Sequence, residues 1–201
     1  VERALKNKTN LDNVFSIVKN FRKKNNKTPI VLMGYMNPIE EIGYKNFATK
    51  SKKNGIDGVL VVDLPPEESN DLNYELRKKD LKQIYLASPT TNTDRLKKII
   101  KKTSGYLYYV SLKGITGSKI KNVSHIRKRI ALIKEISDKK IPIAVGFGIK
   151  DKFSAKSLSA FSDGIIIGSS IVELVEKNMK NKALMFKKIR NFITGINKVL
   201  N

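Results

Sequence analysis

The chain has 201 residues, with 40 Lys and Arg against 18 Asp and Glu, which gives a formal net charge of +22. It has no cysteine and a single histidine, which excludes a disulfide framework, a thiolate nucleophile and a histidine-based metal cluster. It contains no run of about 18 apolar residues, so we expect no membrane-spanning helix. No secretory leader is apparent, so we expect a cytoplasmic protein. The length suits one domain, residues 1–201, with a sizeable core.

The large positive charge has two interpretations. A nucleic-acid partner would be attracted by a basic surface, but a lysine-rich composition produces the same total. The lysines are spread over nearly every predicted helix, only 7% of the residues are aromatic, and no nucleic-acid-binding signature is present. We therefore predict that the charge reflects biased composition and that the protein has no nucleic-acid partner.

Apolar runs and amphipathic segments alternate along the chain. The first amphipathic segment, Leu11–Lys24, carries apolar residues on one face and predicts a helix. Six apolar runs predict strands, at Pro29–Tyr35, Gly58–Leu64, Gln83–Pro89, Tyr106–Leu112, Pro142–Phe147 and Gly164–Ser169. Further helices are predicted at Ile39–Lys53, Glu67–Lys79, Asp94–Lys102, Ser124–Asp138, Lys152–Phe161 and Lys182–Leu200. The strand runs are apolar without interruption, which predicts a parallel sheet buried on both faces by helices.

The glycines distinguish two α/β architectures. A nucleotide-binding doubly wound sheet would carry Gly-x-Gly-x-x-Gly after its first strand, whereas here glycines follow the last three strands. This position favours a (β/α)8 TIM barrel, in which phosphate is commonly held after strands 7 and 8, although only six of the eight strands are found. The last strand leads directly into a helix, whose N-terminus attracts anions. Ser170 and Glu173 fit a capping box at that helix start.

Distinctive motifs occur at the predicted strands and their ends. They are Pro-Ile-Val-Leu-Met-Gly-Tyr-Met-Asn-Pro (29–38), Asp-Gly-Val-Leu-Val-Val-Asp-Leu-Pro-Pro-Glu-Glu (57–68), Tyr-Tyr-Val-Ser (108–111) with Gly-Ile-Thr-Gly (114–117), Val-Gly-Phe-Gly-Ile (145–149) and Gly-Ile-Ile-Ile-Gly-Ser-Ser-Ile-Val (164–172). Together these motifs resemble those of the tryptophan synthase α subunit family. The resemblance covers essentially the whole chain in register. It implies that strands 3–8 of the barrel are present, so that residues 1–201 form a single, incomplete TIM barrel.

The resemblance also implies a reaction. The family is a group of lyases that split indole-3-glycerol phosphate into indole and glyceraldehyde 3-phosphate, and the indole passes to a β subunit in an α2β2 complex. The α subunit needs no cofactor, since pyridoxal phosphate belongs to the partner. The catalytic glutamate and aspartate of the family are expected upstream of residue 1, so no catalytic residue is assigned in this chain. We expect the 201-residue chain alone to be inactive.

The remaining roles are carried over from the resemblance, position by position. The phosphate-binding residues are Gly117, Gly148, Gly168 and Ser169, and the substrate pocket contains Met33, Leu60, Val62, Leu86, Tyr108 and Thr116. For the aliphatic pocket residues, ordinary barrel core is the other interpretation. Asp63 is expected to support the mobile loop that carries Thr116, or alternatively to cap the helix near Glu67. The residues expected to contact the β subunit are Tyr35, Asn37 and Pro65.

Two alternatives stay open. One is a catalytically inert scaffold that binds and activates the β subunit. The other is a different phosphate-binding barrel, such as a phosphosugar isomerase or epimerase, against which the motifs at 35–38 and 63–68 argue.

Overall fold

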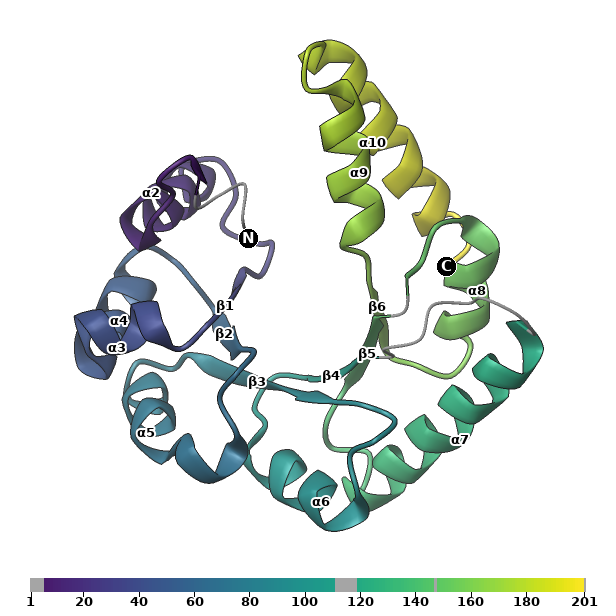
Figure 1. Ribbon diagram of the computed structural model, residues 1–201, viewed down its shortest axis with the longest axis horizontal. Helices are drawn as coiled ribbons and strands as arrows, with labels where there is room; N and C mark the ends of the chain where they lie inside the picture. The colour runs from purple at the N-terminus through teal and green to yellow at the C-terminus, as the bar shows by residue number, and fades with distance from the viewer. Residues whose placement is uncertain (1–5, 111–118, 147, 201) are drawn as a thin grey trace. The chain divides into compact units, whose positions relative to one another are not determined.

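A computed structural model describes residues 6–110, 119–146 and 148–200. The chain divides into two compact units: unit 1 comprises residues 1–85 and 101–105, and unit 2 comprises residues 86–100 and 106–201. The described residues form six parallel strands separated by helices (Figure 1), as the alternating sequence pattern predicts.

Unit 1 begins with a helix that covers one side of a small parallel sheet. Helix α2 (Leu11–Arg22) is capped by Asn10, whose side chain accepts a hydrogen bond from the amide of Asn13 at 3.0 Å. Strands β1 (Val31–Gly34), β2 (Gly58–Val61) and β3 (Lys82–Ala87) are paired in parallel, in the order β1-β2-β3. The connecting helices are α3 (Asn37–Ile42), α4 (Tyr44–Lys53), the 3-10 turn η1 (Pro66–Glu68) and α5 (Asn70–Lys78).

Unit 2 repeats this organisation. Strands β4 (Leu107–Val110), β5 (Ile143–Gly146) and β6 (Gly164–Ile166) are parallel, in the order β4-β5-β6. Their helices are α6 (Thr93–Lys102), whose last two residues belong to unit 1, α7 (Lys119–Ile136), α8 (Lys152–Ser159), α9 (Ser169–Asn178) and α10 (Lys182–Asn197). In Figure 1, α9 and α10 lie side by side beyond the end of β6.

The helix-facing side chains of the strands form the cores. In unit 1, Val59 and Val61 of β2 pack among residues from α2, α4 and α5, and the rings of Phe15 and Phe47 lie 6.4 Å apart. In unit 2, Leu107 and Tyr109 of β4 are fully buried. Each such side chain removed from water contributes about 1.5–3 kcal/mol, so these faces supply most of the stability of each unit.

Four details of the sequence prediction are wrong. The helix predicted over 39–53 is interrupted by Gly43, whose φ of 77° breaks it into α3 and α4. The helix predicted from Glu67 begins instead as η1 and continues as α5. Burial on both faces holds for β2 but fails for β1, where Met33 is exposed, for β4, where buried and half-buried residues alternate, and for β6, where all three residues are half-buried. The capping box at Ser170 is absent because this residue already lies inside α9, where its hydroxyl donates to the carbonyl of Ile149 at 2.6 Å.

One arrangement occurs in both units, at the start of a strand. The carboxylate of Asp57, just before β2, accepts the amide of Ile30 at 2.7 Å and pairs with Arg22 at 2.6 Å. The carboxylate of Asp163, just before β6, accepts the amide of Ile143 at 2.9 Å and pairs with Lys134 at 2.9 Å. In each case an Asp-Gly pair fixes the register of its strand against the neighbouring strand and ties both to a helix.

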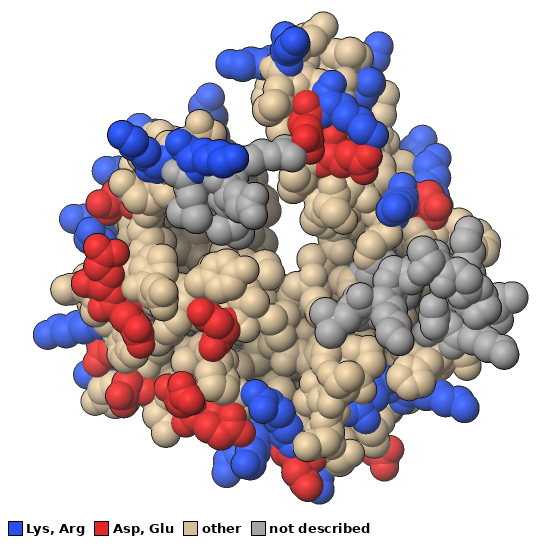
Figure 2. Space-filling model, in the orientation of Figure 1, with Lys and Arg blue, Asp and Glu red and all other residues tan. Residues whose placement is uncertain are grey.

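Charged residues are distributed unevenly over the face shown in Figure 2. Lys and Arg are scattered around the visible surface, whereas Asp and Glu gather over the part of unit 1 that contains α3, η1 and α5. This face shows no continuous basic stripe, and the absence of a nucleic-acid partner stays a prediction.

Candidate functional site

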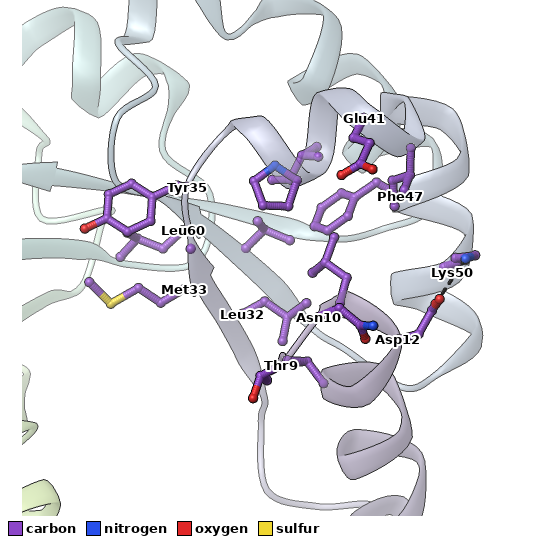
Figure 3. A pocket seen from close by; sticks show the side chains of 17 residues that line it. Thr9, Asn10, Asp12, Leu32, Met33, Tyr35, Glu41, Phe47, Lys50 and Leu60 are labelled. Atoms are coloured by element: carbon purple, nitrogen blue, oxygen red, sulfur yellow. Dashed lines mark hydrogen bonds and ion pairs between the residues drawn. The ribbon is translucent and has the colours of Figure 1, made fainter. Parts of the chain in front are cut away.

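An open cavity of about 550 Å³ lies in unit 1 between α2, β1, β2 and α3. Figure 3 shows Met33, Tyr35 and Leu60 on one side of this cavity. The Nζ atom of Lys50 lies 3.2 Å from a carboxylate oxygen of Asp12 at its rim. The lining is mainly apolar, so the cavity favours apolar groups over charged ones.

Three of the predicted pocket residues lie together on one face of the sheet in unit 1. Met33 of β1 is the register partner of Leu60 in β2, and Val62 lies two residues further along on the same face. The amide of Val62 donates to the carbonyl of Gly34 at 2.9 Å, which extends the pairing beyond β2. Leu60 is 2% exposed, whereas Met33 is 61% and Val62 37% exposed. Leu60 therefore serves the core, and the other two present apolar surface that a ligand could cover.

Asp63 holds the segment that follows β1. Its carboxylate accepts a hydrogen bond from the amide of Met36 at 2.9 Å, and Met36 is the N-cap residue of α3. A carboxylate at this point also interacts favourably with the helix dipole. The alternative in which Asp63 caps the helix near Glu67 is wrong, since η1 begins after Pro65 without a side-chain cap.

The predicted partner-contact residues belong to this same region of unit 1. Tyr35 is 49% exposed and directly precedes the N-cap residue of α3, and Asn37 is the first residue of the helix. Pro65 directly precedes η1, two residues after Asp63. The hydrogen bond from Met36 to Asp63 therefore ties together the two segments that carry all three residues.

Two predicted pocket residues belong to unit 2, Leu86 near the end of β3 and Tyr108 in β4. Both are half-buried. Tyr108 lies on the face opposite to the buried Tyr109, and its ring packs against Gly146: a Cβ atom added at Gly146 would lie 2.3–2.7 Å from ring atoms and the hydroxyl of Tyr108. Because glycine has no Cβ atom, the Tyr108 side chain can lie this close to the backbone of β5.

The glycine-bearing junctions after β5 and β6 are joined directly. The hydroxyl of Ser170, in the first turn of α9, donates to the carbonyl of Ile149, the residue after Gly148. Gly148 has a φ of 50°, and an added Cβ would meet no described atom within 4 Å at Gly148 or at Gly168. Ser169 is the first residue of α9 and is exposed. Gly117 and Thr116 lie outside the described residues.

The first turn of α9 begins with two amides that make no hydrogen bond within the part of the chain that the structure describes. The amides of Ile171 and Val172 donate to the carbonyl of Gly168, at 3.0 and 3.1 Å. The preceding amides, those of Ser169 and Ser170, have no acceptor among the described residues. Two such amides at the positive end of a helix dipole can bind an anion.

Three tyrosines of unit 2 are expected to make the stability of the fold decrease at high pH. Burial raises the pKa of Tyr106, Tyr108 and Tyr109 above the usual 10.0, because the charged phenolate loses hydration; for Tyr109 the nearby Arg129 acts in the opposite direction. The folded state therefore retains these protons at a pH where the unfolded chain has released them.

We expect the stability contributed by these groups to be complete below pH 10 and to fall as the pH rises beyond it. Melting temperatures measured between pH 8 and pH 11.5 check this, and Tyr108→Phe should fall less steeply than wild type above pH 10. Tyr74→Phe, at an exposed position of α5, is the matched control. An equal slope for Tyr108→Phe and wild type would contradict the expectation.

Within the described residues, no group of three or more His, Cys, Asp or Glu side chains is placed to hold a metal ion. Among these same residues, no helix combines the length and the hydrophobicity that a membrane span requires.

Sequence reasoning missed the polar contacts that position these segments. Arg22 donates from Nε to the carbonyl of Gly55 at 2.7 Å, from Nη1 to that of Thr28 at 2.8 Å and from Nη2 to Asp57 at 2.6 Å. The recurring Asp-Gly pair at 57–58 and 163–164 is the only sequence signal that could have suggested these contacts. It does not reveal which cation each aspartate pairs with.

Parallel strands alternating with helices, and glycine-bearing junctions at strand ends, define an α/β protein of the TIM-barrel class. Solved structures support this class: that of the tryptophan synthase alpha chain from Legionella pneumophila has a TM-score of 0.88 and 36% identity, and covers 99% of this chain and 72% of its own. A structure of the tryptophan synthase a2b2 complex from Pyrococcus furiosus gives a TM-score of 0.88 at 33% identity, covering 98% and 77%.

Sequence comparison identifies the family. The family model for the tryptophan synthase alpha chain matches residues 1–201. The tryptophan synthase alpha chain of Vesicomyosocius okutanii is 43% identical over 199 residues, which is 99% of this chain and 74% of that protein. That of a Janthinobacterium strain is 42% identical over 200 residues, again 74% of its length. The chain belongs to the tryptophan synthase alpha chain family, which confirms both the resemblance and the lyase class predicted from the sequence.

Proposed function

We propose that this chain binds indole-3-glycerol phosphate for cleavage into indole and glyceraldehyde 3-phosphate, and that it delivers the indole to a tryptophan synthase β chain. Membership of the family supports the reaction. The observation that carries the site is the hydrogen bond between Ser170 and Ile149, because it joins the two glycine-bearing junctions at which a phosphate group would be held.

The phosphate dianion would be bound mainly by main-chain groups. The amides of Ser169 and Ser170 and the dipole of α9 provide the positive end, and the Ser169 hydroxyl adds a donor. The open space at Gly148 and Gly168 lets phosphate oxygens approach the backbone. Gly117 completes the proposed set by resemblance.

The indole ring would be held by apolar side chains. In unit 1, Met33 and Val62 present exposed apolar surface, with Leu60 beneath. In unit 2, Leu86 and Tyr108 are half-buried, and their part in binding the indole is assigned by resemblance alone. Thr116 is assigned to the loop over the substrate by resemblance. A flat ring such as that of Tyr108 gives extensive contact to an indole without requiring a hydrogen bond.

No acid–base residue is assigned within the 201 residues. Asp63 lies at the end of a strand, but its carboxylate is engaged by the amide of Met36, which suits a supporting role. The cleavage needs one group to remove and one to supply a proton. We assign neither role to a residue of unit 1 or unit 2 and limit the proposal for these residues to binding of the phosphate and the indole.

The proposed partner is a β chain that binds at Tyr35, Asn37 and Pro65. The Pyrococcus furiosus relative is described in an a2b2 complex with mutual activation, and we propose the same type of α2β2 heterotetramer here. The proposal places pyridoxal phosphate in the partner and no cofactor in this chain, and it assigns the complex to the cytoplasm. An inert scaffold that only activates the β chain would share these contacts and would lack the phosphate site.

A carboxylate placed at the head of α9 tests the phosphate site. We expect Ser169→Asp to weaken binding of glycerol 3-phosphate, measured by calorimetry, at least tenfold, because two like charges about 5 Å apart near a protein surface repel by about 3 kcal/mol. The fold should be retained, since an acidic residue at a helix N-terminus is favourable. Asn191→Asp, exposed on α10, adds the same charge elsewhere and should bind as wild type does. If wild type shows no affinity for the phosphate, the proposed function is wrong.

A further inference from the structure

Lys102, the last residue of α6, makes an unusual set of contacts in unit 1. Its ammonium group donates to the carbonyl of Pro66 and to the side-chain oxygen of Asn70 at 2.7 Å, and lies 3.5 Å from the hydroxyl of Ser69. All three acceptors belong to the segment 66–70, more than 30 residues earlier in the chain. The acceptors are a carbonyl, an amide oxygen and a hydroxyl, so a half-buried cation is satisfied by neutral groups.

Tyr85 of the neighbouring strand β3 also contacts the segment 66–70, through a hydrogen bond to Ser69. Ser69 is completely buried, and its hydroxyl donates to the carbonyl of Pro66 at 2.8 Å while it accepts from the hydroxyl of Tyr85 in β3 at 2.6 Å. The carbonyl of Pro66 thus accepts from both Ser69 and Lys102. Buried polar networks with every group satisfied hold one geometry tightly.

This network is continuous with the proposed partner surface. Pro66 directly follows Pro65, and Asp63 lies two residues before Pro65 with its carboxylate on the amide of Met36. Lys102 is therefore connected, through the residues 63–70, to the segment that contains Tyr35 and Asn37. The path from Lys102 to Met36 consists of two hydrogen bonds and the four residues 63–66.

We propose that Lys102 is a positioning residue that preorganises the partner-binding segments 63–70 and 35–37 for the β chain. This inference rests on the proposed function. Association is stronger when a surface is already held in its bound geometry, because less conformational entropy is lost on binding. Lys102 reaches this surface from the following βα unit and is not itself assigned to the contact.

The substitution Lys102→Met separates positioning from folding. Methionine keeps most of the apolar stem but removes the three donors, so unit 1 should stay folded while 63–70 loses its anchor. Lys102→Arg keeps donors within reach of the same acceptors, so it should retain most of the amide protection in 63–70 and most of the affinity for the β chain. Lys101→Met removes an equal charge from the adjacent exposed position and is the matched control.

Two measurements decide the matter. Hydrogen exchange of amides in 63–70 and at Met36 should be at least tenfold faster in Lys102→Met than in wild type or Lys101→Met. Affinity for the tryptophan synthase β chain of the same organism, measured by surface plasmon resonance, should fall at least tenfold, with the melting temperature lowered by only a few degrees.

Unchanged exchange or unchanged affinity in Lys102→Met would overturn the proposal, as would a loss of affinity matched by general unfolding of unit 1. A failure of the proposed function would be recognised by a different result, since wild type itself would then not bind the β chain. In that case the exchange result for 63–70 would still show whether Lys102 holds the segment.

Discussion

Replacing Arg22 by methionine is expected to lower the free energy of unfolding of unit 1 by about 3 kcal/mol. The guanidinium group donates four hydrogen bonds, to the carbonyls of Gly55, Asn25 and Thr28 and to the carboxylate of Asp57. Hydrogen bonds to charged groups contribute about 1.5–3 kcal/mol each when desolvated. The side chain of Arg22 is only 15% exposed, but that of Asp57 is 53% exposed, so the ion pair itself contributes little.

The loss comes mainly from the carbonyls left without a donor where α2, the turn before β1 and the turn before β2 meet. Lysine at position 22 should recover only part of the loss, since an ammonium cannot reproduce the planar fork of arginine. Urea unfolding followed by circular dichroism measures the difference. Lys19→Met, at an exposed position on the same helix, removes an equal charge and should change stability by less than about 0.5 kcal/mol. Equal stabilities of Arg22→Met and Lys19→Met would refute this account of Arg22.

Gly146→Ala is expected to lower the free energy of unfolding by about 2 kcal/mol or more. The new methyl group would lie 2.3 Å from the hydroxyl and 2.4 Å from a ring carbon of Tyr108. Strand β5 cannot yield, because Gly146 is paired with Val110 of β4 on one side and with Ile166 of β6 on the other. The Tyr108 ring must therefore leave its position, with a cost typical of an overpacked core.

Two further readouts identify the cause. Once exposed, Tyr108 should lose the burial that raises its pKa, so the alkaline absorbance titration of tyrosine should begin at lower pH than in wild type. In a Tyr108→Ala background, Gly146→Ala should cost less than about 0.5 kcal/mol, because the colliding ring is gone. Gly164→Ala is the matched control, since its methyl would lie at an ordinary 3.7 Å from Ala144. A similar loss in Gly164→Ala and Gly146→Ala would show that glycine flexibility, and not the ring, is responsible.

These two sites connect stability with the proposed function. Arg22 and Asp57 fix the base of β1 and β2, the strands whose opposite ends carry Met33, Val62 and Asp63. Gly146 supports the ring that we assign to the indole pocket. A loss at either position should therefore reduce ligand or partner binding indirectly, through misplacement of a strand end or a ring.

The sequence by itself was sufficient for the class of fold, the family and the approximate place of each strand. The reason is physical: an apolar run such as 59–62 or 165–167 is buried wherever it lies, and its length and flanking glycines depend on near neighbours in the chain. The same local pattern also gives a wrong prediction: apolar periodicity predicts one helix over 39–53, but the positive φ of Gly43 divides it in two.

Only the tertiary structure revealed which polar groups meet. The bonds from Met36 to Asp63, from Ser170 to Ile149 and from Lys102 to Pro66 join residues 21–36 positions apart. Hydrophobic burial needs no particular partner, so a pattern of apolar residues encodes it. A hydrogen bond requires a specific donor and acceptor within about 3 Å. That requirement is met only after the strands have set the positions of their ends.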